Sequence, residues 1–313
     1  MELRVLQYFL AVAREQSISA AAESLHLSQP ALSTQLRNME KELGKQLLIR
    51  GTKGSRKVLL TEDGMILRKR AEEILSLVKR TEDEIARSSE TVMGDVFIGA
   101  GETDIIRLFA RTARCIQQKF PDIRYHISSG NAEQVLEQLD HGLIDFGLLF
   151  GSVDTRVYES VPVAAQDTWG VLMRRDAPLA KKDSIRPQDL WDKPLIVSMQ
   201  RADDRYLERW LKKDLSKLHI VATYNLVYNA SLLVDEGLGY ALCFDKLINT
   251  EGTALCFRPL TPTLKANACI VWKKYQVFSK PASLFLHCLQ EQLQQEQDSS
   301  QTQSEPPQNG AQQ

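Results

Sequence analysis

The sequence has no apolar stretch close to the roughly 18 residues that a membrane-spanning helix needs, although 43% of its 313 residues are hydrophobic. Its first residues, 1–4, lead directly into an amphipathic segment and not into a signal peptide. We therefore expect a cytoplasmic protein without a membrane segment. The chain is long enough for two or three compact units.

Cysteine is scarce, and its five copies show neither a CxxC pair nor a spacing typical of metal ligands. We expect reduced, mostly buried thiols, with oxidation sensing by one of them as the less favoured alternative. The histidines are equally scattered, so neither a metal site nor a bound cofactor is expected. The five cysteines are Cys115, Cys243, Cys256, Cys269 and Cys288.

Sequence motifs of common enzyme classes are missing as well. There is no G-x-S-x-G elbow, P-loop, H-E-x-x-H motif or complete G-x-G-x-x-G loop. An enzyme is therefore not expected. The formal net charge is only −1, which excludes a general affinity of the whole chain for polyanions and directs attention to local charge.

The segment 17–43 is typical of two short helices joined by a tight turn. Small residues at 20–22 let the first helix lie close to a neighbour, and residues 26–28 make the turn. Ser28 is a good N-cap for the second helix, and Pro30 is tolerated in its first turn. This arrangement predicts a helix-turn-helix.

The second helix of this segment has an apolar stripe and a polar face. The stripe has spacings of 4, 3 and 4 and consists of Leu32, Leu36, Met39 and Leu43. The polar face carries side-chain types that contact base edges and phosphates. Its members are Gln29, Ser33, Thr34, Arg37 and Lys41. The competing interpretation is a small helical bundle with an ordinary polar surface.

A turn-rich hairpin follows, with apolar runs at 47–50 and 58–60 around the basic segment 51–57. Between Arg37 and Lys57 seven lysines and arginines face two acids, a local excess of five positive charges. Such a basic patch on a nearly neutral protein is typical of a surface for a polyanion. The N-terminal region is therefore predicted to be a winged helix-turn-helix.

A long helix is predicted directly after the hairpin. Thr61 can cap it, and Glu62 and Asp63 lie in the first turn, where the helix dipole favours acids. Its apolar positions follow a heptad pattern that favours pairing with a second copy. These positions are Leu67, Ala71, Ile74, Val78 and Ile85, with Thr81 between the last two. The alternative is an amphipathic helix packed on its own domain.

The rest of the chain alternates strands and helices. The first set comprises strands at 96–100, 123–128 and 144–150 and helices at 104–119 and 131–139. The second comprises strands at 169–173, 194–198, 219–226 and 240–244 and helices at 203–215 and 229–236. A strand at 268–272 and a helix at 281–293 can return to complete the first unit. Two α/β units with parallel sheets create a cleft, and ligands bind at the C-terminal ends of such strands.

These patterns divide the chain into four parts. A winged helix-turn-helix domain spans 1–60, and a linker or dimerisation helix spans 61–90. An α/β domain with a ligand cleft between its two units spans 91–293, with lobe I at about 91–163 and 267–293 and lobe II at about 164–266. The tail 294–313 is rich in Gln, Ser, Glu and Pro and is expected to be disordered.

From residue 1 to about 293, the chain resembles the LysR-type transcriptional regulators. The N-terminal residues that carry the resemblance are Leu6-Gln7-Tyr8-Phe9, Ser19-Ala20-Ala21-Ala22, the run 27–33, Leu36, Glu40, Leu43-Gly44, Leu47-Leu48-x-Arg50 and Leu60-Thr61-x-x-Gly64. Further matches are Phe120-Pro121-Asp122, Gly130-Asn131, Gly142-Leu143-Ile144-Asp145 and the run 237–242. The resemblance implies a winged helix-turn-helix, a long linker helix and a two-lobed effector domain like that of periplasmic binding proteins. It also implies homodimers or homotetramers on double-stranded promoter DNA, a small-molecule effector and contact with RNA polymerase.

Carried over by position, the resemblance assigns DNA contacts to the second helix and the hairpin. The expected DNA-binding residues are Ser28, Gln29, Pro30, Ser33, Thr34, Arg37, Arg50, Lys53 and Arg56. Two departures from the family pattern stand out. Thr34 occupies a position that is often Arg in this family, and the wing at 51–57 is longer and more basic than usual.

The effector cleft is expected at the strand ends of the two lobes. Its predicted residues are Gly101, Glu102, Thr103, Ser129, Phe150, Gly151, Ser198, Met199, Arg201 and Tyr228. For each of them an ordinary loop position is an equal alternative. Arg201 and Arg205 favour an anionic ligand, whereas Glu102 on the opposite lobe favours a ligand that also carries a donor or a cation.

Two other protein classes share part of this pattern. A solute-binding transport protein would have the two lobes but would carry a signal peptide and no basic winged domain. A DNA-organising structural protein would not need two α/β lobes. We therefore expect a sequence-specific transcriptional regulator that responds to a small molecule.

Overall fold

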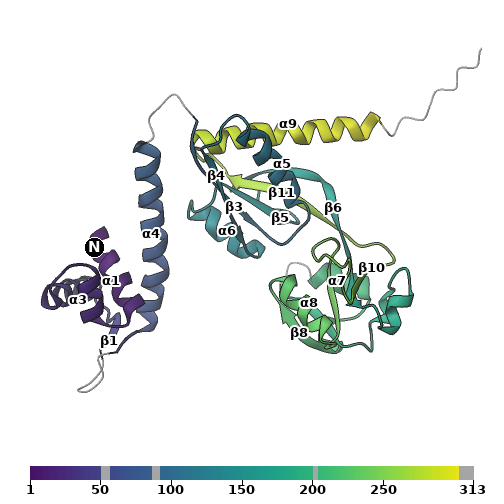
Figure 1. The fold of residues 1–313 in the computed structure, drawn as a ribbon, viewed down its shortest axis with the longest axis horizontal. Coiled ribbons are helices and arrows are strands. Elements are labelled where there is room, and N and C mark those ends of the chain that lie inside the picture. Colours follow the sequence, from purple (N-terminus) through teal and green to yellow (C-terminus); the bar gives the residue numbers. More distant parts are fainter. Residues whose placement is uncertain (51–56, 87–91, 200–203, 303–313) are drawn as a thin grey trace, which may run out of the picture. The chain divides into compact units, whose positions relative to one another are not determined.

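The structure is a computed structural model that describes residues 1–50, 57–86, 92–199 and 204–302. Its contacts divide the chain into two compact units, Met1–Ser88 and Ser89–Gln313. The N-terminal unit is drawn in purple to blue in Figure 1 and the C-terminal unit in teal to yellow. The long helix that the sequence assigns to a separate linker belongs to the N-terminal unit.

The N-terminal unit is a helix-turn-helix followed by a hairpin and a long helix. Its elements are α1 (Leu3–Glu15), α2 (Ile18–Ser24), α3 (Gln29–Leu43), β1 (Leu48–Arg50), β2 (Val58–Leu60) and α4 (Glu62–Ala86). The Ser28 hydroxyl accepts a hydrogen bond from the Ala31 amide and so caps α3, as predicted. Gly44, at φ 66°, ends this helix in the left-handed conformation that glycine adopts without strain. The antiparallel pairing of β1 with β2 confirms the predicted hairpin.

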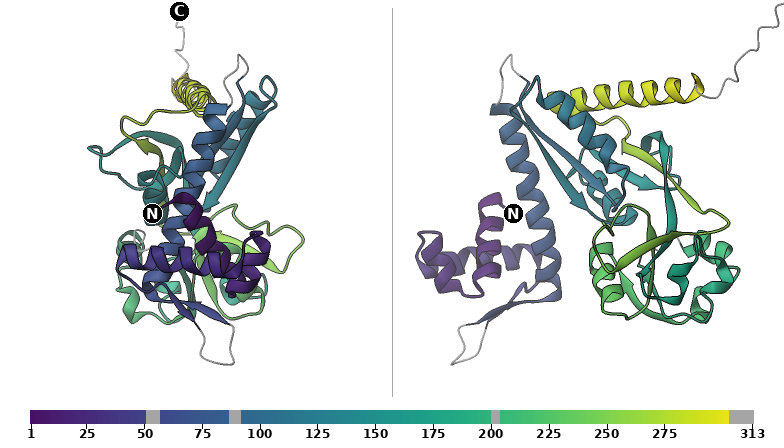
Figure 2. Two further views of the ribbon diagram at one scale, coloured as in Figure 1. Left: turned by 90° about the vertical axis from the view of Figure 1, so that its left-hand side faces the viewer. Right: turned by 45° about the vertical axis from the view of Figure 1, so that its right-hand side comes forward.

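The core of this unit includes the first half of α4. Phe9 and Leu36 are fully buried, and Ala71 of α4 is 0% exposed, with Leu67 and Ile74 packed around the same core. Figure 2 shows α1 and α3 beside the N-terminal half of α4. The prediction that Ala71 lies in a seam between two subunits is therefore wrong, because its side chain is already covered within its own subunit.

Lobe I of the C-terminal unit is a sheet with helices on its faces. Its elements are β3 (Gly94–Ala100), α5 (Ile106–Gln117), β4 (Ile123–Ser129), α6 (Ala132–Asp140), β5 (Phe146–Phe150), β11 (Lys265–Lys273) and α9 (Lys280–Thr302). β3 pairs in parallel with β4 and β5, as the predicted βαβαβ pattern requires. β11 returns to pair antiparallel with β5. Phe285 of α9 is fully buried against Phe109 and Phe146, so this helix completes the core of lobe I.

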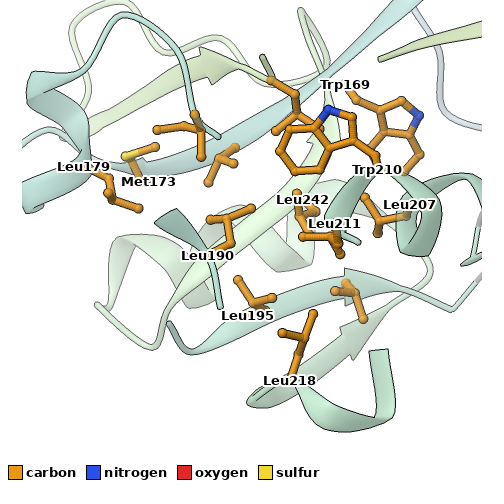
Figure 3. Close-up of a cluster of buried hydrophobic side chains, with 14 of the residues drawn as sticks. Trp169, Met173, Leu179, Leu190, Leu195, Leu207, Trp210, Leu211, Leu218 and Leu242 are labelled. Carbon is orange, nitrogen blue, oxygen red and sulfur yellow. The ribbon is translucent and has the colours of Figure 1, made fainter. Parts of the chain in front are cut away.

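Lobe II has its own sheet and its own apolar core. Its elements are β7 (Leu195–Ser198), α7 (Asp204–Leu211), β8 (Ile220–Tyr224), α8 (Val227–Asp235), β9 (Tyr240–Phe244) and β10 (Leu255–Pro259), with 3-10 turns at Pro178–Lys181, Pro187–Asp189 and Leu215–Lys217. Trp169 and Trp210 lie over a layer of leucines that includes Leu195 and Leu242 (Figure 3). The sequence analysis missed β10, which is short and lacks the alternation of a half-buried strand.

One long strand, β6 (Tyr158–Arg174), belongs to both lobes. It pairs antiparallel with β11 in lobe I and with β9 and β10 in lobe II, so the combined strand order is β4-β3-β5-β11-β6-β9-β7-β8. The expectation of parallel sheets is thus correct only for the outer strands. The sequence predicts a strand at 169–173 because only that part of β6 is continuously apolar.

The C-terminal helix is longer than predicted. α9 continues to Thr302, so residues 294–302 are helical and the prediction of a disordered tail from residue 294 is wrong there. Residues 303–313 lie outside the described part. In the described residues no helix is long and apolar enough to cross a membrane.

Candidate functional site

The outer face of α3 presents most of the predicted DNA-contacting residues. Gln29, Pro30, Thr34, Arg37 and Lys41 are exposed. The Thr34 hydroxyl donates to the Pro30 carbonyl oxygen at 2.8 Å, which occupies its proton within the helix. Within the described residues Arg37 and Lys41 make no ion pair, so their charges remain available for phosphates.

Two positions on α3 differ from the predicted pattern. Ser33 is only 7% exposed, so it does not lie on the outer face as predicted. Its small side chain borders the stripe of Leu32 and Leu36 and is covered together with it. Leu43, expected to be the last member of the stripe, is 40% exposed, because the helix ends at Gly44 beyond the packed core.

The carboxylate of Glu40 connects α3 to the hairpin. Its Oε1 accepts hydrogen bonds from the amides of Leu47 and Leu48 at 2.9 and 3.0 Å, and its Oε2 accepts one from Arg50 Nη2 at 2.8 Å. The sequence analysis gave Glu40 no role, since no periodicity indicates a carboxylate that binds amides seven and eight residues away. Arg50 is therefore positioned by α3, while Lys53 and Arg56 lie outside the described residues.

In the C-terminal unit a small cavity lies where the two lobes meet. Its volume is about 30 Å³, and it unites four of the predicted cleft residues. These are Gly101, Glu102 and Phe150 from lobe I and Ser198 from lobe II. The sequence analysis missed the aromatic wall, in which the Phe244 ring packs on Phe150 and Trp169 with centroid distances of 4.9 and 4.5 Å. The sequence did offer one signal for this wall, because Phe150 and Phe244 end the two predicted strands 144–150 and 240–244.

Glu102 makes a direct contact between the lobes. Its carboxylate accepts a hydrogen bond from the Val227 amide, at the first turn of α8, at 2.5 Å. α8 has Leu226 at its N-cap position, where no side chain can cap the helix. Glu102 of lobe I therefore supplies both the missing hydrogen-bond acceptor and the negative charge that a helix N-terminus favours.

The residue next to Glu102 has a different role. Thr103 is buried, and its hydroxyl donates to Asp167 Oδ2 at 2.5 Å and accepts from the Ile105 amide at 3.0 Å. The prediction that Thr103 faces the cleft is wrong. Burial raises the pKa of Asp167 above its usual range, while the hydrogen bond from Thr103 opposes this shift. Asp167 lies on β6, where the strand passes from one lobe to the other.

The other predicted effector residues are not brought into this cavity. Ser129, Gly151, Met199 and Tyr228 are exposed and do not line it. Arg201 lies outside the described residues. Tyr224, Asn225 and Val227 line the cavity from lobe II instead, where β8 ends at Tyr224 and α8 begins at Val227.

A winged helix-turn-helix joined to a two-lobed α/β unit defines a class of DNA-binding regulators, and the comparisons identify the family. Residues 3–65 match the bacterial regulatory helix-turn-helix proteins of the LysR family, and residues 89–294 match the LysR substrate binding domain. The chain therefore belongs to the LysR family, which consists of transcriptional regulators and not of enzymes.

Individual relatives agree with this assignment. The chain is 31% identical over 197 residues to the hydrogen peroxide-inducible genes activator of Pectobacterium carotovorum, a match that covers 63% of this chain and 64% of that protein. It is 28% identical over 256 residues to a probable RuBisCO transcriptional regulator of Synechocystis, covering 80% of this chain and 72% of the relative. The match to the first relative thus spans less than two thirds of that protein.

The fold is also found in a solved full-length regulator. The crystal structure of CbnR in complex with its target DNA superposes with a TM-score of 0.73 at 22% identity. The alignment covers 93% of this chain and 99% of CbnR. This similarity establishes the shared fold.

Proposed function

We propose that this protein regulates transcription in the cytoplasm by binding promoter DNA through α3 and the β1–β2 hairpin. The observation that carries this proposal is the face of α3, where Gln29, Arg37 and Lys41 are exposed on a helix fixed to the protein core. An amide and two cations on one helix match the donors and acceptors of base edges and phosphates. The DNA complex of CbnR, which has the same fold, supports this use of the N-terminal unit.

A pair of glutamine variants tests this proposal. Gln29 and Gln35 are both exposed on α3, but they lie on different sides of the helix. We expect Gln29→Ala to lose roughly 1–3 kcal/mol of discrimination between a cognate site and random DNA. Gln35→Ala should leave binding to both DNAs unchanged. Arg37→Ala should weaken both kinds of DNA and reduce the salt dependence. Fluorescence anisotropy on the two DNAs at several salt concentrations measures this, and equal losses for Gln29→Ala on both would contradict the base contact.

We further propose that α4 pairs with a second copy through the side of the helix that carries Ile66. Three large apolar residues on α4 are strongly exposed: Met65, Ile66 and Ile85. Ile66, at 63% exposure, contributes little to its own subunit, so Ile66→Glu should leave subunit stability unchanged while it disrupts a homodimer or homotetramer. Sedimentation velocity and circular dichroism test this in parallel, with Lys79→Glu, an exposed position on the other side of the same helix, as the charge control. An unchanged oligomer with Ile66→Glu would contradict the pairing face.

We infer that an effector binds between the lobes and that the described form is closed. A cavity of about 30 Å³ holds little more than one water molecule, whereas pockets for drug-sized ligands enclose roughly 300–1,000 Å³. A larger ligand therefore requires the lobes to separate and the contact between Glu102 and Val227 to break. A change of lobe orientation that depends on the effector would alter DNA binding or contact with RNA polymerase.

A ligand screen with a matched variant tests this inference. Thermal-shift measurements on the full chain with small carboxylates, amines and neutral metabolites identify compounds that stabilise the wild-type protein. We expect such a compound to bind Glu102→Ala more tightly if it does not use this carboxylate, because the lobe contact no longer opposes opening. Glu133→Ala, in the first turn of α6, is the control and should leave affinity unchanged. Equal affinity of all three proteins would contradict a role of Glu102 in closure.

A further inference from the structure

Two of the five cysteines are accessible, and they lie on neighbouring helices. Cys115 of α5 is exposed and Cys288 of α9 is partly exposed, whereas Cys243, Cys256 and Cys269 are buried. The regulator described above uses none of these thiols. Solvent exposure therefore allows these two thiols, and not the other three, to react with a dissolved reagent.

The contacts between α5 and α9 bring the two cysteines to one interface. Thr112 Oγ1 donates to Gln292 Oε1 at 2.8 Å, and Arg111 Nη2 donates to Glu296 Oε1 at 2.8 Å. The two helices therefore run antiparallel, and they lie side by side in Figure 1. One turn beyond Thr112 is Cys115, and one turn before Gln292 is Cys288.

The ionisation of Cys288 provides a second indication that the sulfurs are close. Burial, then Glu291, then Cys115 raise the pKa of the Cys288 thiol, while Lys119 lowers it. Cys288 is therefore neutral at physiological pH, and its neighbours include Cys115 of α5 and Lys119, which follows that helix. Of the two thiols, Cys288 is therefore the less suited to reacting first with an oxidant.

The surroundings of Cys115 differ from those of Cys288. Cys115 lines an open groove of about 720 Å³ between α5, β6 and α9, together with Arg111 and Arg114. Lys119 follows one turn later on the chain. The groove gives a small oxidant access to this exposed sulfur, whereas Cys288 is partly covered.

We propose that Cys115 and Cys288 form a redox modification site that closes into an intramolecular disulfide when a hydroperoxide oxidises it. The Cys115 thiolate attacks the terminal peroxide oxygen, the O–O bond breaks, and one equivalent of alcohol or water leaves. This converts Cys115 into a sulfenic acid. The Cys288 sulfur then attacks the Cys115 sulfur, the S–O bond breaks, a second molecule of water leaves with the thiol proton, and the disulfide forms. The two cysteines lose two electrons, and the peroxide accepts them.

Closing this disulfide would fasten α9 to α5. Both helices cover lobe I, and α9 carries Phe285 and Leu289 into its core. A covalent link between them restricts any movement of α9 relative to the rest of lobe I. The modification therefore acts on the lobe that also supplies Glu102 to the contact with lobe II.

The experiment counts free thiols in the full-length protein before and after treatment with hydrogen peroxide. After denaturation, a maleimide mass tag labels every remaining thiol, and peptide mass spectrometry locates the disulfide. We expect the tagged thiols to fall from five to three in the wild-type protein and in the control Cys256→Ser to fall from four to two. Cys115→Ser and Cys288→Ser should each form no intramolecular disulfide, and thioredoxin or dithiothreitol should restore the wild-type count.

A second measurement tests the geometry without an oxidant. A trivalent arsenical bridges two thiols only where their sulfurs can approach each other, so it should bind the wild type and Cys256→Ser and protect two cysteines from the tag. It should not bind Cys115→Ser or Cys288→Ser. The proposal is overturned if neither reagent couples the two residues, if peroxide yields only sulfinic acid at Cys115, or if the disulfide joins two chains.

Discussion

Glu40 and Glu102 perform the same chemical task in two different settings. Each carboxylate accepts hydrogen bonds from backbone amides of another element, Glu40 from Leu47 and Leu48 and Glu102 from Val227. Glu40 also pairs with Arg50, and its partners lie within ten residues of it in a single compact unit. Glu102 has its partner 125 residues away, on the opposite lobe.

This difference separates a permanent contact from a reversible one. Around Glu40, several short-range bonds fix the hairpin on the recognition helix, and its side chain is only 13% exposed. Around Glu102, one hydrogen bond in a partly exposed position, beside the packing of Phe150 on Phe244, joins two lobes that each have a core. A rigid surface suits the reading of DNA, whereas a small set of contacts between lobes suits a change of state.

The largest effect should follow removal of the Glu40 carboxylate. Glu40→Ala leaves two buried amides and Arg50 without their acceptor, and we expect a loss of roughly 2–4 kcal/mol of unfolding free energy in the N-terminal unit. Glu40→Gln keeps an acceptor oxygen and should lose less. All four tryptophans lie in the C-terminal unit, so chemical unfolding followed by circular dichroism and by tryptophan fluorescence separates the two units. A fluorescence midpoint that moves as much as the helical signal would contradict a local role.

A smaller effect is expected for Glu102→Ala. A partly exposed cap hydrogen bond contributes about 1 kcal/mol, so local opening of α8 should increase roughly fivefold in population. Hydrogen exchange of peptides from the start of α8 measures this opening. Glu133→Ala, near the start of α6, is the matched control and should leave α8 exchange unchanged. Identical α8 exchange in wild type and Glu102→Ala would mean that the two glutamates do not differ as described.

The smallest effect concerns Asp167, a third carboxylate beside the Glu102 contact. Because its folded pKa is raised, the folded state binds the proton more tightly than the unfolded state does. Stability is therefore highest below the ordinary pKa of 3.8 and falls as the pH rises from there through the raised value. Asp167→Asn, which can still accept the Thr103 hydrogen bond, should remove this fall and stabilise the protein slightly at pH 7. Tryptophan-monitored unfolding across pH 4–7 tests this, and a profile that stays parallel to the wild type would contradict it.

The sequence predicted the local elements well because their signals are local. Ser28 as a cap, the alternation of strands and helices in lobe I and the apolar stripe of Leu32, Leu36 and Met39 all depend on residues within a few positions of one another. The contacts of Glu40 and Glu102 depend on chain segments that approach only after folding. No spacing rule in the sequence indicates them.

The long helix α4 illustrates why an apolar period alone is ambiguous. Spacings of four and three produce a stripe whether the stripe meets a second helix of the same kind or the rest of the same subunit. The structure uses Leu67 and Ala71 for the subunit core and leaves Ile66 and Ile85 exposed. The first part of the stripe therefore packs within the subunit, whereas pairing through its last member, Ile85, stays a prediction.

At the cleft the sequence could not predict the direction of individual side chains. Glu102 and Thr103 are neighbours at the end of the same strand, yet Glu102 lines the cavity and Thr103 is turned inward to Asp167. Position at a strand end identifies the loop but not the direction of each side chain. Buried hydrogen-bond partners decide that direction, and these come from β6 and α8.

The passage of β6 and β11 between the lobes also sets the order in which the lobes can be completed during synthesis. The described core of lobe II is contiguous and is available once residue 260 has left the ribosome. Lobe I begins earlier but needs Ile270 and Phe285 to close its core. The lobe that starts first therefore finishes last, and until β11 has been made β5 exposes the edge that β11 will cover. A chain that stops before α9 would carry a finished lobe II beside an open, aggregation-prone lobe I.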